Sequence, residues 1–166
     1  MRAALRIMLV SVLALALASC GSTKFRKYRG PAVTSVVVDK SERNMWLLHN
    51  DRVLKTYDVG LGNSPTGHKQ FEGDGKTPEG AYVIDRRNPN SNYHLSIGIS
   101  YPNAADVAFA EAQGKQPGGE IFIHGHSGFR DGYYGDWTAG CIAVTDREME
   151  TIYSMVRNGT PITIRP

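Results

Sequence analysis

Cysteine is scarce in this chain, with only Cys20 and Cys141 among 166 residues. Two cysteines exclude a small domain that is held together by a framework of disulfides. They allow one disulfide, yet Cys20 closes a leader segment that predicts a lipid on its sulfur. Cys141 is then a lone thiol, which is either a small buried apolar residue or a reactive group.

The chain also has no large excess of positive or negative charge. Lysine and arginine total 19 and aspartate and glutamate 16, and two of the arginines lie in the leader, which leaves the remainder almost neutral. We therefore expect no nucleic acid partner. Internal repeats and low-complexity segments are also lacking.

The longest apolar run lies near the N-terminus. Arg2 and Arg6 precede an uncharged stretch at residues 7–18, which is too short to span a bilayer and is typical of an export signal. The signal ends in Leu17-Ala18-Ser19-Cys20, which resembles the lipobox at which bacterial lipoprotein precursors are cut and acylated. The alternative is an ordinary secretory signal, in which Cys20 carries no lipid.

These features predict three segments. Residues 1–19 are expected to be a lipoprotein signal peptide, 20–32 the lipidated N-terminus and a tether, and 33–166 one folded domain. A domain of this length buries about 70% of its unfolded surface. We expect an exported, cell-envelope protein whose lipid on Cys20 anchors it to a membrane, at the periplasmic face of the outer membrane.

The pattern of apolar residues predicts an α+β domain that is mainly β with two helices. A long loop is expected at 60–78, where glycine and polar residues dominate. Thr145 and Glu148 form a capping box at the start of the second helix, and Gly159 is expected as its left-handed C-cap. The predicted strands are 34–39, 45–49, 52–59, 81–85, 93–99, 121–123 and 160–165, and the predicted helices are 103–113 and 145–158.

Candidate catalytic residues lie between the strand at 121–123 and the helix at 145–158. A thiol that attacks an amide must be a thiolate, and an imidazole within hydrogen-bond reach can take its proton and later protonate the leaving amine. His124 and Cys141 can supply that pair. Gly140 leaves space beside the nucleophile, so that backbone N–H groups can face a developing oxyanion.

The motifs around these residues resemble one family. The string I-H-G at 123–125, T-A-G-C-I at 138–142 and K-T-P-E-G-A-Y at 76–82 are similar to the L,D-transpeptidase catalytic domain (YkuD) family, over nearly the whole of 33–166. Y-H-L-S at 93–96 and Y-P-N-A-A-D at 101–106 are closer to the murein-acting, YafK-like branch. The resemblance implies a mixed β-sandwich or barrel-like core and catalysis without a cofactor.

The resemblance also implies a mechanism. In the family a cysteine attacks the carbonyl of the third residue of a peptidoglycan stem peptide, a D-amino acid leaves, and an amine or water takes the acyl group from the thioester. Here Cys141 matches the nucleophile, His124 the general base and acid, and the carbonyl of Gly125 the group that orients the histidine. The expected function is a peptidoglycan L,D-transpeptidase.

Two positions depart from the commonest family pattern, S-H-G-C-x-R. Ala139 stands in place of the histidine and Ala143 in place of the arginine. The first leaves the oxyanion site to the backbone, and the second removes a cation that could bind a substrate carboxylate. The acyl acceptor is therefore open, and an L,D-endopeptidase or L,D-carboxypeptidase, including one that releases wall-linked lipoprotein, is the alternative.

Substrate-binding candidates lie around the pair. His126 is either a substrate contact or a solvated loop residue, and Tyr133, Tyr134, Asp136 and Trp137 are either one wall of a cleft or core. The segment at 76–80 reads as a turn. The candidates for substrate contact are His94, His126, Ser127, Tyr134, Trp137 and Thr138.

Two other functions compete with this one. His94, His124, His126 and Cys141 could ligate zinc in an exported metallopeptidase, but the sequence has no H-E-x-x-H, and His-x-His alone is a weak signal. We therefore expect no metal. A wall-binding lipoprotein that has lost its activity is the other alternative, and the intact His124 and Cys141 count against it.

Overall fold

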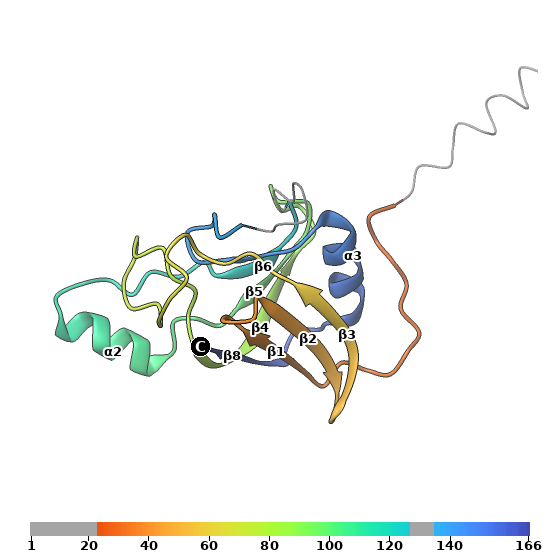
Figure 1. The fold of residues 1–166 in the computed structure, drawn as a ribbon, viewed down its shortest axis with the longest axis horizontal. Helices are drawn as coiled ribbons and strands as arrows, with labels where there is room; N and C mark the ends of the chain where they lie inside the picture. The colour runs from red at the N-terminus through yellow and green to blue at the C-terminus, as the bar shows by residue number, and fades with distance from the viewer. Residues whose placement is uncertain (1–22, 127–134) are drawn as a thin grey trace, which may run out of the picture.

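The strands form one curled sheet. In a computed structural model, which describes residues 23–126 and 135–166, the strand order is β3-β2-β1-β8-β4-β5-β6-β7 (Figure 1). The predicted fold class, mainly β with two helices, is confirmed. The strands are β1 (Ser35–Asp39), β2 (Asn44–His49), β3 (Arg52–Asp58), β4 (Gly80–Asn88), β5 (Ser96–Ile99), β6 (Phe122–His124), β7 (Ile142–Ala143) and β8 (Pro161–Arg165), and the helices α2 (Ala104–Ala112) and α3 (Asp146–Met155).

The first three strands form the expected antiparallel meander. Buried and half-buried residues alternate along β1, so Val36 and Val38 point into the core. Met45 and Leu47 of β2 are fully buried, and Val36 pairs with Leu47 across the two strands. The meander therefore supplies part of the core.

The last strand of the chain lies in the middle of the sheet. β8 runs parallel to β1, with Val36 opposite Ile162, and antiparallel to β4, with Tyr82 opposite the same Ile162. Residues from both ends of the chain thus meet at the centre of the sheet.

The sheet curls along β4. The first residues of β4 pair with β8, whereas Ile84 to Asn88 pair with β5, and a bulge lies between Ile84 and Arg86. Such irregularities bend a strand and increase its twist. β5 is buried along its whole length and pairs with β6, which carries His124 at its end.

Helix α3 covers β5 and β6, and α2 lies at the other end of the molecule (Figure 1). The predicted capping box is confirmed, because Glu148 N–H donates to Thr145 Oγ1 and Thr145 N–H to Glu148 Oε2. The predicted end of α3 is wrong. Val156 is already extended, its carbonyl accepts a hydrogen bond from Arg87, and Gly159 forms the turn into β8 instead of the helix cap.

Other strands differ from the prediction too, and the strand predicted at 81–85 extends to Asn88. The strand predicted at 93–99 begins only at Ser96, because His94 has a left-handed backbone with a φ of 68°. β7 was not predicted, since two residues carry no readable alternation. The helix predicted at 103–113 is present as α2, with Asn103 and Gln113 as its caps.

The described part of the predicted tether packs on the domain. Lys24 Nζ donates to the carbonyl of Pro89 at 2.6 Å, and Arg26 forms an ion pair with Glu150 of α3 at 2.7 Å. Basic side chains of this segment thus meet acceptors on the domain, and the division of the chain at residue 32 stays a prediction. In the described ranges, no helix has both the length and the apolar character needed to cross a membrane.

Candidate active site

Strands β6 and β7 bring the two predicted catalytic residues together. The strands are parallel, with His124 opposite Ala143, and Cys141 directly precedes β7. Both side chains line one open pocket of about 280 Å³. Its other lining residues are Asn88, Ser91, Asn92, Tyr93, Ser96, Glu120 and Phe122.

Three contacts fix the His124 ring. Nδ1 lies 2.6 Å from the carbonyl oxygen of Gly125, the contact that the resemblance implied. The ring of Tyr93 stacks on the imidazole with centroids 4.5 Å apart, and Trp137 meets it edge-on at 5.8 Å. His124 is only 3% exposed, so its orientation is set by packing on both sides.

The contact with Gly125 defines the tautomer of His124. A carbonyl oxygen can only accept, so Nδ1 must carry the proton and the lone pair of the neutral ring is on Nε2. Burial lowers the pKa of His124, and nearby His126 acts in the same direction, while the Gly125 carbonyl opposes the shift. The ring is therefore neutral at neutral pH and can act as a base through Nε2.

The Cys141 thiol is half-buried beside the histidine. Its Sγ donates to the carbonyl oxygen of Glu120 at 3.5 Å. Burial raises the pKa of the Cys141 thiol, and the Glu120 carboxylate adds to the shift, although a backbone hydrogen bond from Phe122 opposes it. In this structure the cysteine and the histidine are thus a neutral pair rather than a thiolate–imidazolium pair.

Thr138 holds the loop that carries the nucleophile. Its Oγ1 donates to the carbonyl of Cys141 at 2.7 Å and accepts from the N–H of Gly140 at 3.1 Å. Thr138 is 4% exposed and supports the loop from within, and its role as a substrate contact stays a prediction.

Gly140 is required for the shape of this loop. Its φ is 134°, and a Cβ on it would lie 2.6 Å from the carbonyl oxygen of Lys76, in the segment predicted as a turn. Because its N–H is bonded to Thr138, it does not face an oxyanion as predicted. Gly140 contributes space and conformation instead.

The other predicted contacts are dispersed. The His94 ring is bonded to Glu150 of α3 at 3.1 Å and does not line the pocket, so its role as a substrate contact stays a prediction. His126 is exposed, and its N–H donates to Asp146. Trp137 is 39% exposed beside His124. Ser127, Tyr133 and Tyr134 lie outside the described residues, as does Cys20.

Asp136 is not a wall of the cleft. Its carboxylate forms an ion pair with Arg43 at 2.7 Å and accepts the N–H of Leu61 at 2.9 Å, so it joins the meander to the loop before Cys141.

The sequence did not identify Tyr93 as a site residue. The signal was its position one residue before His94 in the Y-H-L-S string.

The described residues contain no candidate metal site. Within residues 23–126 and 135–166, no three His, Cys, Asp or Glu side chains are grouped so as to hold one ion. Of the four side chains considered for zinc, His94 is turned to Glu150. The grouped pair that remains is Cys141 with His124.

The fold belongs to a known family. A family model described as the L,D-transpeptidase catalytic domain (YkuD) matches residues 34–164. This chain belongs to that family, which confirms the resemblance of its motifs. It is also 32% identical over 108 residues to YafK from Escherichia coli (strain K12), a protein named for L,D-transpeptidase activity. The match covers 63% of this chain and 38% of YafK, so the chain corresponds to less than half of that relative.

Solved structures have the same fold. The helical cell shape determining protein Pgp2 from Campylobacter jejuni superposes with a TM-score of 0.60 at 27% identity, over 89% of this chain and 53% of Pgp2. An L,D-transpeptidase from Mycobacterium smegmatis superposes with a TM-score of 0.55 at 16% identity, over 81% of this chain and 59% of its own. The second likeness shows the fold alone.

Proposed function

We propose that this protein is a cysteine-dependent L,D-transpeptidase that acts on peptidoglycan stem peptides through a thioester on Cys141. The observation that carries the proposal is that Cys141 and His124 line one pocket, with the base nitrogen of His124 defined by the Gly125 carbonyl. Family membership supports the substrate class.

The first step is proton transfer. The Cys141 thiol donates to Glu120 in the resting structure, so rotation about its Cα–Cβ bond must turn the S–H toward Nε2 of His124. Contacts between a nucleophile and its base are often loose before substrate binds. His124 then takes the proton as the sulfur attacks, and Gly125 and Tyr93 hold the imidazolium in place.

The second step is acyl transfer. The thiolate sulfur bonds to the carbonyl carbon of the third stem residue, and the carbonyl electrons move to oxygen. The N–H of Cys141 is our candidate donor to that oxyanion, because the N–H of Gly140 is engaged by Thr138. When the tetrahedral intermediate collapses, the C–N bond breaks, and His124 gives its proton to the leaving amine.

The acceptor of the acyl group distinguishes two activities. Transfer to an amine gives a cross-link or an exchanged residue, whereas transfer to water gives a trimmed peptide. The second candidate function is hydrolysis, including release of wall-linked lipoprotein, and the observation that supports it is Ala143. It lies fully buried in β7 opposite Gly60, so this position provides no cation for an incoming carboxylate.

The test is incubation of the purified protein with muropeptides, followed by mass spectrometry. We expect products from the wild type and none from Cys141→Ala or Cys141→Ser, with both variants folded. A carbapenem should add its mass to Cys141. Activity that survives in both variants but is lost with a chelator would replace the proposal with a metallopeptidase, and no activity in any sample would indicate a wall-binding protein.

We further propose that Cys20 carries a lipid that holds the domain at the periplasmic face of the outer membrane. The lipobox-like Leu17-Ala18-Ser19-Cys20 supports this. Metabolic labelling with a fatty-acid analogue and membrane fractionation test it. Label on the wild type but not on Cys20→Ala is expected. An unlabelled, soluble wild type would support the ordinary secretory signal.

A further inference from the structure

One wall of the Cys141 pocket is a loop without regular structure. Residues 89–95 join β4 to β5, and Ser91, Asn92 and Tyr93 of this loop line the pocket. Tyr93 also stacks on His124, so the position of the loop sets the position of the base. A polar loop of this kind needs contacts from outside to keep one conformation.

The first outside contact comes from α3. Glu150 Oε1 lies 3.1 Å from Nε2 of His94, the residue that follows Tyr93 and has a φ of 68°. One turn earlier, Asp146 Oδ1 accepts the N–H of His126 at 2.6 Å. One helix face thus holds the segments that follow Tyr93 and His124.

The second contact comes from the N-terminal segment. Lys24 Nζ donates to the carbonyls of Pro89 at 2.6 Å and His94 at 3.1 Å, which lie at the two ends of the loop. Arg26 donates through Nε and Nη2 to Glu150 Oε2 at 2.9 and 2.7 Å. The segment therefore binds both the loop and the carboxylate that holds it.

We propose that Lys24 and Arg26 are positioning residues, which latch the loop at 89–95 so that Tyr93 keeps His124 in its reactive orientation. This inference rests on the proposed function of His124 and Cys141. Single exposed ion pairs contribute little to stability. The latch instead combines two hydrogen bonds from Lys24 to the ends of the loop with two hydrogen bonds from Arg26 to Glu150. We expect it to affect the position of Tyr93 and His124 rather than global stability.

The test compares charge-matched variants from the same short segment. Lys24→Ala and Arg26→Ala remove the latch, whereas Lys27→Ala and Arg29→Ala remove the same charge without a described contact to the loop. The measurements are the rate of Cys141 acylation by muropeptide or carbapenem, amide hydrogen exchange in residues 89–95, and the thermal midpoint. Arg26→Lys keeps the charge opposite Glu150 as a rescue.

We expect the double variant Lys24→Ala/Arg26→Ala to lower the acylation rate roughly tenfold, since small displacements of a catalytic group have effects of this order. Exchange at 89–95 should speed up, the thermal midpoint should change little, and Arg26→Lys should restore most of the rate lost in Arg26→Ala. The Lys27 and Arg29 variants should match the wild type.

Two results would overturn the latch. One is unchanged acylation and unchanged loop exchange in the double variant. The other is an equal loss in the Lys27 and Arg29 variants, which would point to overall charge. If the wild type itself acylates nothing, the proposed function fails separately, and the exchange data alone decide whether Lys24 and Arg26 hold the loop.

Discussion

At the scale of single residues, burial shifts the pKa values of His124 and Cys141 in opposite directions. It lowers the pKa of His124 and raises the pKa of Cys141, so both shifts favour the neutral pair. A resting thiolate would be open to reaction with electrophiles other than the substrate. Under the proposed mechanism, the neutral thiol becomes reactive only when a bound substrate brings it to His124, so reactivity depends on binding.

The neutral pair predicts two different pH profiles. Alkylation of Cys141 by iodoacetamide should be slow at pH 7 and rise as pH passes 9, because the pKa of the thiol is raised. Acylation by substrate should already be active at pH 6.5, because the lowered pKa of His124 leaves it unprotonated there. Mass spectrometry of the modified protein measures both rates, with Cys141→Ala as the blank.

A resting thiolate–imidazolium pair would give a different result. Alkylation would then be fast and almost independent of pH between 5 and 8. That outcome would contradict the directions of both pKa shifts. It would leave Cys141 as the nucleophile but would place the proton on His124 before substrate arrives.

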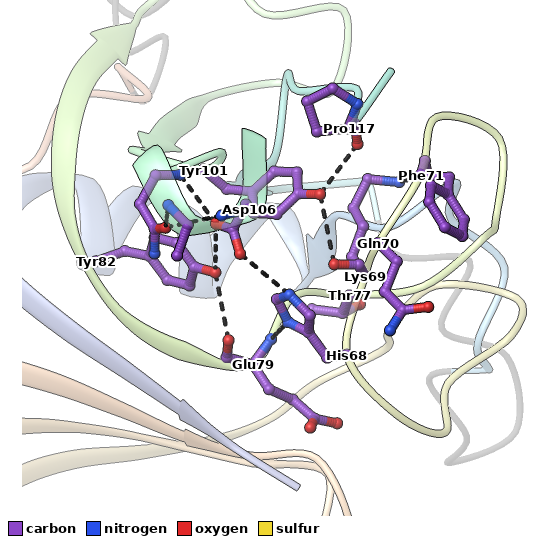
Figure 2. Close-up of polar contacts among 12 residues, drawn as sticks. His68, Lys69, Gln70, Phe71, Thr77, Glu79, Tyr82, Tyr101, Asp106 and Pro117 are labelled. Carbon is purple, nitrogen blue, oxygen red and sulfur yellow. Dashed lines mark hydrogen bonds and ion pairs between the residues drawn. The ribbon is translucent and has the colours of Figure 1, made fainter. Parts of the chain in front are cut away.

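At the scale of elements, α2 depends on polar contacts. Its buried residues are Asp106 and Ala110, so it offers little apolar surface to the core. Asp106 binds His68 at 3.1 Å and the hydroxyl of Tyr82 at 3.0 Å (Figure 2). It also accepts the N–H of Asn103. His68 Nδ1 accepts the N–H of Glu79, so neither ring nitrogen is left for catalysis. We call the cluster of His68, Tyr82 and Asp106 the brace, because its hydrogen bonds hold α2 against the rest of the domain.

Removing the brace should release α2 without changing the catalytic pocket. Asp106→Ala removes the closer acceptor of the buried Tyr82 hydroxyl, which keeps only the Glu79 carbonyl oxygen at 3.3 Å, and it leaves the Asn103 N–H without its side-chain acceptor. The free energy of unfolding should therefore fall by roughly 1–3 kcal/mol. Amide exchange at residues 104–112 should speed up. Glu111→Ala, on the exposed side of the same helix, should change neither quantity. Equal stability of the two variants would show that α2 is held by other contacts.

The elements that could be predicted from the sequence are those set by local chemistry. The capping box at Thr145 follows from side chains three residues apart, and the meander follows from alternation. The start of β5 could not be predicted, because His94 adopts its left-handed backbone where Lys24 and Glu150 bind the loop from distant parts of the chain. β7 is defined by partners distant in the sequence, with β6 on one side and Gly60 on the other.

At the scale of the whole molecule, the candidate site is assembled from separate segments. His124 and Cys141 were predicted because their motifs resemble a family, but the roles of the supporting residues depend on tertiary structure. Thr138 reads as a loop residue near the nucleophile and is instead buried beneath it. His94 reads as a substrate contact and instead binds α3. Spacing along the chain does not show which way such side chains turn.

Global stability should fall at alkaline pH because three tyrosines are buried. Burial raises the pKa of Tyr57 to about 12, and burial together with Asp106 raises the pKa of Tyr82 and Tyr101 further. In the unfolded chain tyrosine ionises near pH 10. Stability from these groups is therefore complete below about pH 10 and is lost as pH rises toward the folded pKa values, by roughly 2–3 kcal/mol for Tyr57 at pH 12.

Tyr57 allows this effect to be isolated. Its hydroxyl is buried and has no hydrogen-bond partner among the described residues, whereas the Tyr82 hydroxyl is bonded to Asp106. Tyr57→Phe should keep or raise stability at pH 7 by up to about 1 kcal/mol and should flatten the decline above pH 10. Tyr82→Phe should lower stability at pH 7. Urea unfolding followed by tryptophan fluorescence at pH 7, 10 and 11 measures both. Lower stability of Tyr57→Phe at pH 7 would mean that this hydroxyl has a hydrogen-bond partner. An unchanged slope of stability against pH above pH 10 would mean that Tyr57 ionises in the folded protein as it does in the unfolded chain.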